Sequence, residues 1–128
     1  MIFLDSNFLI ALISDKSEKH QDAIQICDLI NEYQIINNIV LEETLDGIQE
    51  LEKRKSIKEI YEIISQVTEI IYITPEDYQE ALEIYETYSN KIRYTDCIKI
   101  KTMKDKKIDK IVSFNQDFDN KEKIIRIK

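Results

Sequence analysis

The sequence predicts an α/β fold, a three-layer α/β/α sandwich with a mainly parallel central sheet, and two observations support this prediction. Short runs of apolar and β-branched residues alternate with longer segments whose apolar residues recur at helical spacing. Strands connected by helices pair in parallel, and the helices cover both faces of the sheet. With one glycine and one proline in 128 residues, no linker marks the start of a second domain, so residues 1–128 are expected to form a single domain.

Each expected element follows from its own pattern. Continuous apolar or β-branched runs indicate strands, and apolar residues at positions i, i+3 and i+4 indicate helices. In chain order, the expected strands cover residues 1–4, 35–36, 68–73, 108–114 and 124–127, the last of them at an edge of the sheet. The expected helices cover residues 6–13, 18–33, 38–54, 56–66, 74–88 and 95–104. The stripes expected to face inward on the third and fourth helices are Leu41, Leu45 and Ile48, and Ile60, Ile63 and Ile64.

Local signals mark the start of several helices. Ser6 or Asn7 can cap the first helix, directly after the strand that ends at Asp5, and Asn38 can cap the third helix. Residues 74–77, Thr-Pro-Glu-Asp, combine an N-cap threonine, a proline in the first turn and acidic side chains near the positive end of the helix dipole. The chain is therefore expected to pass several times from a strand directly into a capped helix.

Composition and charge distribution narrow the functional classes. The net charge is −7, but residues 99–128 contain 10 basic and 5 acidic side chains, so a basic C-terminal quarter follows an acidic body. Such a surface can bind cations in one place and phosphates beside it, and the alternative is that these lysines are only solvated. Cys27 and Cys97 are expected as reduced thiols, because one pair cannot form a disulfide framework. No apolar run approaches the roughly 20 residues that span a bilayer, so we expect a cytoplasmic protein without a membrane partner.

Acidic residues follow the strands at the place where parallel sheets bind ligands. Asp5 ends the first strand and residues 115–118 follow the fourth, so both lie at the carboxyl edge of the sheet. Asp96 opens a helix, and Ile100 and Met103 on its own helical face turn it toward the core. Carboxylate oxygens are the ligands that Mg²⁺ prefers, and such ions cleave phosphodiesters by activating water and stabilising the leaving oxygen. The sequence therefore predicts an acidic metal site.

Four motifs, in this order, resemble those of the PIN (PilT N-terminal) domain family across essentially the whole chain. They are residues 2–7 (IFLDSN), 40–45 (VLEETL), 94–98 (YTDCI) and 111–118 (IVSFNQDF). The resemblance implies that Asp5, Glu43 and Asp96 are catalytic acids that hold Mg²⁺ or Mn²⁺. The fourth acid of the family usually stands at the position of Asn115, whose amide oxygen can still ligate a metal, and nearby Asp117 can supply the missing charge. Glu43 lies opposite the expected apolar stripe of its helix, so a solvated position is the alternative for this residue.

The resemblance also implies a function. The chain is similar to the toxin ribonucleases of virulence-associated protein C type, so we expect an endoribonuclease that cleaves single-stranded RNA, with an antitoxin protein as partner and a homodimer as its assembly. The alternative is a PIN-fold module that binds RNA or a partner chain without cleaving, which Asn115 and the net acidity favour. A haloacid-dehalogenase phosphatase also begins with a strand that ends in Asp, but it requires a second Asp where Asn7 stands.

Further residues beside the acids have candidate roles. The hydroxyls of Ser6 and Thr95 can orient a water, a metal ligand or a substrate, or can cap their helices. Lys99 and Lys101 are candidates for contacts to RNA phosphates. Because carboxylates that are held close together repel one another, we also expect Asp5→Asn to leave the metal-free protein equally or more stable.

Overall fold

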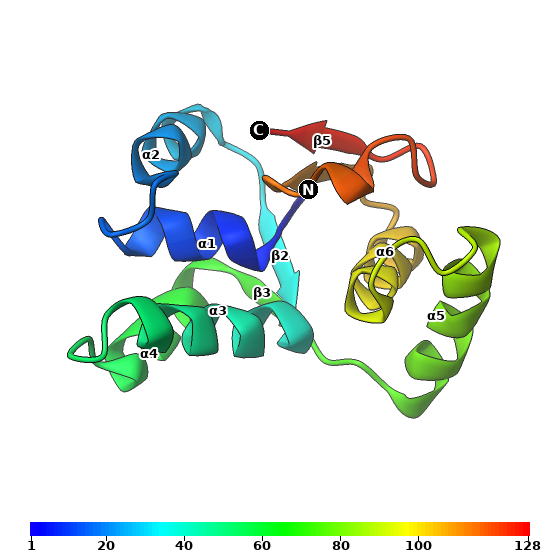
Figure 1. The fold of residues 1–128 in the computed structure, drawn as a ribbon, viewed down its shortest axis with the longest axis horizontal. Coiled ribbons are helices and arrows are strands. Elements are labelled where there is room, and N and C mark those ends of the chain that lie inside the picture. Colours follow the sequence, from blue (N-terminus) through cyan, green and yellow to red (C-terminus); the bar gives the residue numbers. More distant parts are fainter.

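The computed structural model describes the whole chain, residues 1–128, as five strands and six α helices (Figure 1). The strands are β1 (Ile2–Leu4), β2 (Gln34–Asn37), β3 (Glu69–Ile71), β4 (Lys110–Val112) and β5 (Ile125–Ile127). The helices are α1 (Ser6–Ile13), α2 (His20–Leu29), α3 (Asn38–Leu51), α4 (Ile57–Val67), α5 (Pro75–Thr87) and α6 (Tyr94–Lys106), and a 3-10 turn, η1, covers Gln116–Phe118. The order of strands and helices expected from the apolar pattern is confirmed.

Strand β1 is the centre of a fully parallel sheet, whose strand order is β3-β2-β1-β4-β5. Phe3 pairs with Ile35 of β2 on one side and with Ile111 of β4 on the other. The chain extends the sheet from β1 through β2 to β3 and then returns to the other side of β1 with β4. The strand order therefore reverses at β1, and the crevice outside the carboxyl ends of the strands at such a reversal is where parallel sheets bind ligands.

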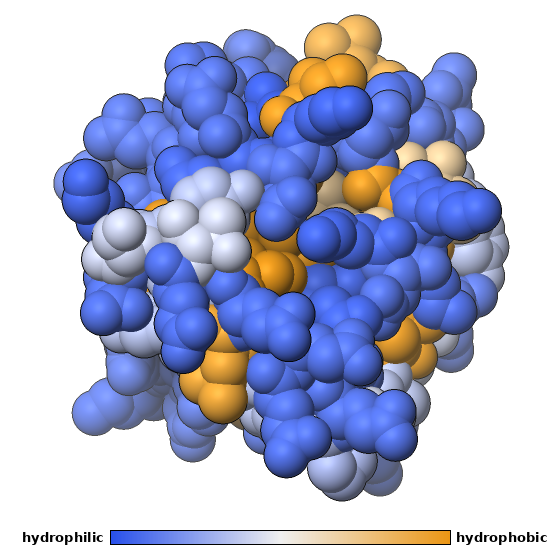
Figure 2. Space-filling view, turned by 90° about the vertical axis from the view of Figure 1, so that its right-hand side faces the viewer, coloured by the Kyte–Doolittle hydropathy of each residue, from blue (hydrophilic) through white to orange (hydrophobic).

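Helices cover both faces of the sheet, which confirms the three-layer arrangement. In Figure 1, α1 to α4 lie on one side of the central strands, and α5 and α6 lie on the other. Phe3, Ile36 and Ile111 in the central strands are fully buried, as expected for strands covered on both faces. Figure 2 shows the outer face on the side of α5, where hydrophilic side chains cover most of the surface and hydrophobic ones form small separate groups. None of the helices has both the length and the hydrophobicity needed to cross a membrane.

Two strands are shorter than predicted because their pairing partners end. Strand β4 stops at Val112, which pairs with Leu4, the last residue of β1. After Leu4 the backbone N–H of Asp5 forms the last hydrogen bond to β4, to the carbonyl of Val112 at 3.0 Å, and the chain then turns into α1. Strand β3 likewise pairs with β2 up to Ile71, opposite the last residue of β2. The predicted ranges 108–114 and 68–73 therefore extend beyond the strands at both ends.

The structure corrects three predictions about the helices. Helix α2 ends at Leu29 rather than at residue 33, because Ile30 adopts an extended backbone that leads the chain toward β2. Asn37, rather than Asn38, caps α3 and accepts a hydrogen bond from a backbone N–H of its first turn. Ile63 was expected to face inward but is 58% exposed, because α4 packs on the core through a narrower stripe.

Helix α5 begins where the sequence predicts, with Thr74 as its N-cap residue. Thr74 and Asp77 form a reciprocal capping box, in which each side chain accepts a hydrogen bond from the backbone N–H of the other residue. Pro75 is the first helical residue, where its missing N–H has no helical partner to lose. The polypeptide therefore leaves β3 and enters α5 with its first helical N–H groups satisfied locally.

Gly47, the only glycine of the chain, lies inside α3 where this helix packs against α1. A Cβ atom added at Gly47 would lie 2.3 Å from Cδ1 of Ile10 in α1, much closer than two carbon atoms approach without repulsion. The missing side chain of Gly47 therefore provides the space for Ile10 between the two helices.

We expect Gly47→Ala to lose most or all of the roughly 1 kcal/mol that the better helix propensity of alanine would contribute, because the Cδ1 methyl group of Ile10 must turn away from the added Cβ. Ile10→Val removes the clashing Cδ1 atom, so the double variant is expected to be more stable than Gly47→Ala alone. Urea denaturation of the wild type, the two single variants and the double variant measures this coupling. Additive effects of the two substitutions would contradict the packing argument.

Candidate active site

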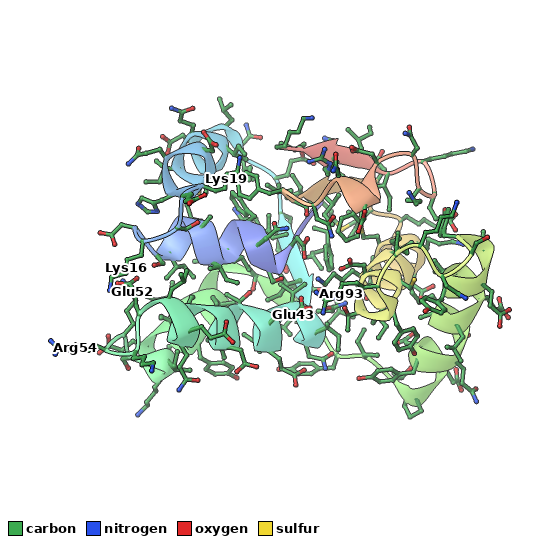
Figure 3. The ribbon with its side chains drawn as sticks, in the orientation of Figure 1. Lys16, Lys19, Glu43, Glu52, Arg54 and Arg93 are labelled. Atoms are coloured by element: carbon green, nitrogen blue, oxygen red, sulfur yellow. The ribbon has the colours of Figure 1, made fainter.

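Three acidic side chains from separate elements converge on one ammonium group. Nζ of Lys99 in α6 lies 2.9 Å from Oδ1 of Asp5, 2.7 Å from Oε1 of Glu43 and 3.1 Å from Oδ1 of Asp96. Asp5 follows β1, Glu43 belongs to α3, and Asp96 belongs to the first turn of α6. Glu43 is labelled in Figure 3, at the end of α3 that faces α6. Residues that are far apart in the sequence therefore share one cation, and we call these three acids with Lys99 the acidic cluster.

Asp5 occupies its place because both of its carboxylate oxygens are hydrogen-bonded. Oδ1 accepts from the backbone N–H of Ser6 at 2.8 Å, and Oδ2 accepts from the hydroxyl of Ser113 at 2.6 Å. Asp5 is also the N-cap residue of α1, so the prediction of Ser6 or Asn7 as the cap is wrong. The side chain of Ser6 instead donates to Oε1 of Glu43 at 2.9 Å. One carboxylate therefore starts the first helix and joins the acidic cluster.

Lys99 is charged although it is buried. Its side chain is 3% exposed, and burial alone lowers the pKa of the ammonium group, but the carboxylates of Asp5, Asp96 and Glu43 outweigh burial and raise that pKa above its ordinary value. Burial raises the pKa of the Asp96 carboxyl group, and the charge of Lys99 opposes this rise. The positive charge of Lys99 thus offsets the repulsion expected among the three acids. The physical reason for expecting Asp5→Asn to be more stable than the wild type therefore no longer applies.

Asn115 occupies the fourth position of the site. Its amide Nδ2 donates to Oδ2 of Asp96 at 3.3 Å, and its Oδ1 accepts from the backbone N–H of Asp117 at 2.9 Å. Asp117 takes part in these contacts through its backbone only. Asn115 therefore contacts the acidic cluster directly, whereas Asp117 supports the position of Asn115.

Two residues that form hydrogen bonds in the site, Ser113 and Asn7, were not predicted as site residues from the sequence. Ser113 is fully buried at the end of β4, and its oxygen also accepts from the backbone N–H of Asn115 at 3.0 Å. Asn7 donates to the hydroxyl oxygen of Ser113 at 3.3 Å and accepts from the backbone N–H of Phe114 at 3.0 Å. These two side chains connect the start of α1 with the end of β4. A polar residue directly after a buried strand is the sequence signal that identifies Ser113.

The lysines do not take the places predicted for phosphate contacts. The ammonium of Lys99 lies inside the acidic cluster, where the three acids engage it, so its contact to RNA stays a prediction. Lys101 is 13% exposed and pairs with Glu80 and Asp105 on the outer side of α6. The same helical spacing that predicts an inward Asp96 also applies to Lys99, which follows three residues later on the same face. The inward position of Lys99 was therefore readable from the sequence.

Two polar groups near the acids have no partner in the chain. The hydroxyl of Thr95 is buried and forms no hydrogen bond. Arg93, the residue before α6, is exposed and forms no ion pair, and in the view of Figure 3 it projects next to Glu43. The exposed Arg93 guanidinium is therefore free to contact a molecule outside the chain, whereas the Thr95 hydroxyl is enclosed by the protein. Arg93 was not identified from the sequence.

Comparisons with known proteins agree on one family and one fold. The model of the PIN domain family matches residues 2–124. Among the curated proteins none matches the chain. Mycobacterium tuberculosis VapC20, described as a sarcin-ricin loop cleaving toxin, is similar in structure with a TM-score of 0.84 and 20% sequence identity, covering 97% of this chain and 98% of that chain.

Two further solved structures have the same fold. A toxin-antitoxin complex from Klebsiella pneumoniae gives a TM-score of 0.76 at 18% identity, with 98% of this chain and 96% of that chain covered. VapBC2 from Rickettsia felis, bound to a DNA fragment from its promoter, gives a TM-score of 0.70 at 20% identity, with 99% and 98% covered. At 18–20% sequence identity, the similarity to these three structures establishes the fold of the chain.

We expect Lys99→Met to destabilise the protein by about 3–5 kcal/mol, because it leaves buried carboxylates without a counter-charge. Lys101→Met on the same helix is the matched control, since its partners Glu80 and Asp105 are about half exposed, and its cost is expected to stay below about 1 kcal/mol. Urea denaturation at pH 7 compares the two variants. Equal losses of stability would show that the charge of Lys99 contributes nothing beyond that of a surface lysine.

Proposed function

The chain belongs to the PIN domain family, and on this basis we propose that it is an endoribonuclease that cleaves single-stranded RNA at the acidic cluster. The observation that carries the proposal is the convergence of Asp5, Glu43 and Asp96 at the point where the strand order reverses. Three carboxylates at one point are costly for the fold, and such an arrangement is typical of a site that binds a cation and acts on phosphates.

We propose Mg²⁺ or Mn²⁺ as the cation that supports cleavage. The donor chemistry fits, because hard divalent ions prefer carboxylate oxygens and the three acids already bind a positive group, the ammonium of Lys99, at a shared point. No group of His, Cys, Asp and Glu side chains forms a ready-made metal site, and Asp5, Glu43 and Asp96 would hold the ion in place of that ammonium. A bound ion supplies an activated water and stabilises charge on the phosphate.

A basic cavity beside the acidic cluster supports RNA as the substrate. The cavity has a volume of about 750 Å³ and includes Asn115, Phe114, Lys19 and Lys128 in its wall. Exposed lysines attract the phosphate backbone, and an aromatic ring can stack on an unpaired base. The size is in the range of pockets that accommodate small ligands, which suits a single-stranded nucleotide better than a duplex. The exposed side chain of Arg93 offers a further contact at the start of α6.

We further propose that the ribonuclease is the toxin of a toxin–antitoxin pair. The similar structures include a toxin from Mycobacterium tuberculosis and a toxin-antitoxin complex from Klebsiella pneumoniae. Helix α4 offers exposed apolar side chains to a partner along the two flanks of its buried stripe, since Tyr61 is 42%, Ile63 is 58% and Val67 is 60% exposed. The expected homodimer stays a prediction, which light scattering of the purified protein tests.

A second function, binding of RNA or a partner without cleavage, is favoured by two specific observations. The acidic cluster contains its own cation in Lys99, and an amide, Asn115, stands where the family usually has a fourth acid. Both features reduce the negative charge that attracts a divalent ion. A protein of this kind would bind single-stranded RNA with and without EDTA and leave it intact.

The proposed activity predicts that Asp96→Asn lowers the cleavage rate of single-stranded RNA by about 100-fold or more in Mn²⁺, because an amide removes the charge that holds the cation. Asp105→Asn, an exposed position on the same helix, is the control and is expected to cleave like the wild type. A 5′-labelled RNA resolved on a denaturing gel, with and without EDTA, gives both rates. Wild-type cleavage that persists in EDTA, or that Asp96→Asn leaves unchanged, would contradict the proposal.

The fourth position generates a separate prediction. Asn115→Ala is expected to slow RNA cleavage more than Asp117→Asn, because Asn115 contacts Asp96 through its side chain and Asp117 contributes its backbone. The rates of both variants are compared in the same assay, after circular dichroism has shown that each is folded. A larger effect of Asp117→Asn would indicate that its carboxylate acts as the fourth acid.

A further inference from the structure

We propose that the ammonium of Lys99 is a built-in competitor of the divalent cation, so that the ion enters the acidic cluster only when the Lys99 side chain has left it. The inference rests on the proposed function for the identity of the cation, and it adds a regulatory element to that site. It concerns the resting state of the protein, in which Lys99 already satisfies the acids.

The contacts of Lys99 are those of a cation in a coordination site. Its Nζ lies 2.7 to 3.1 Å from one oxygen of each of the three acids, and its side chain is 3% exposed. Asp5 is 2% exposed and Asp96 6% exposed as side chains, so these carboxylates have almost no water to replace the lysine. The ammonium is therefore their main counter-charge rather than a peripheral partner.

A divalent ion and the ammonium cannot use the same oxygens at once. A protonated amine carries no lone pair and cannot ligate a metal, and Mg²⁺ binds its oxygen ligands at about 2.0–2.1 Å, which needs the space that Nζ fills. Two positive groups at this distance would also repel each other in a buried site. The remaining oxygens of Asp5 and Asp96 are already engaged by Ser113 and Asn115. Binding of the ion at the shared point thus requires displacement of Lys99.

The geometry also provides a way out for the lysine. Glu43 is the most exposed of the three acids, at 28%, so the cluster opens to solvent on the side of α3. Lysine has a flexible four-carbon stem and a strongly hydrated head group, which favours movement toward water. If the state with Lys99 released makes up at most about a tenth of the molecules, the apparent dissociation constant for the ion rises at least about tenfold.

The test compares Mn²⁺ binding to the wild type and to Lys99→Gln by isothermal titration calorimetry at pH 7, without RNA. Glutamine keeps hydrogen-bonding capacity but removes the positive charge, and Lys101→Gln on the same helix is the control. We expect Lys99→Gln to bind Mn²⁺ at least about tenfold more tightly than the wild type and the control. Equal or weaker binding by Lys99→Gln, or no binding by any of the three proteins, would overturn the proposal.

A second measurement tests the displacement of Lys99 in the wild type alone, so it does not depend on whether Lys99→Gln folds. Acetylation of individual lysines by an N-hydroxysuccinimide ester is followed by mass spectrometry, with the half-exposed Lys104 as internal reference. Lys99 is expected to be protected in EDTA and to react at least about tenfold faster at a Mn²⁺ concentration that saturates binding, because its ammonium is then in solvent. Lys99 that stays protected in saturating Mn²⁺ would overturn displacement.

The two proposals can fail independently. If Lys99→Gln binds Mn²⁺ more tightly than the wild type but the wild type does not cleave RNA, the ribonuclease proposal is contradicted and the competition between Lys99 and the ion is supported. If the wild type cleaves RNA and binds Mn²⁺ as tightly as Lys99→Gln does, the ribonuclease proposal is supported and the competition is contradicted.

Discussion

The ion pairs of Lys99 are the interaction on which the arrangement of the site depends. Without this ammonium, the fold would bury Asp5 and Asp96 and partly bury Glu43 with no compensating charge, at a cost of several kcal/mol per ion. With it, the carboxyl end of β1, helix α3 and helix α6 are tied to one point. The same contact that makes an acidic cluster compatible with a stable fold also occupies the place proposed for the divalent ion.

Sheet topology explains why these residues meet. Strands β1 and β4 are neighbours and run in the same direction, so the residues that follow them, Asp5 and Ser113, lie close enough for a hydrogen bond. Asn37 ends β2, caps α3, and donates from its side chain to the hydroxyl of Thr102 in α6 at 3.0 Å. This buried bond holds together the two helices that carry Glu43 and Lys99. The site is thus built where local hydrogen bonds fix the ends of three adjacent strands.

The charge of the site distinguishes this chain from a nuclease with four acids around its metal. Three carboxylates and one ammonium leave a formal charge of −2, and the amide of Asn115 adds none. In the proposed metal site, a divalent ion would compete with this internal cation for its ligands. The activity of the proposed ribonuclease would then depend on the concentration of the ion as well as on any partner protein, since Lys99 supplies the counter-charge when no ion is bound.

The sequence by itself determined the fold class, the order of the elements and the positions of Asp5 and Asp96, because hydrophobic periodicity and capping chemistry are local properties. It also placed the fourth motif, where Asn115 contacts the acidic cluster.

Tertiary structure decided which side chains share one point. The lengths of β3 and β4 were set by the ends of neighbouring strands, and the backbone path after β4 decided that the side chain of Asn115, rather than that of Asp117, contacts the acidic cluster. Tertiary structure also decided the role of Lys99, because the partners of this buried ammonium include the carboxylates of Asp5 and Glu43. These residues lie 94 and 56 positions away along the chain, so no local sequence pattern brings them together with Lys99.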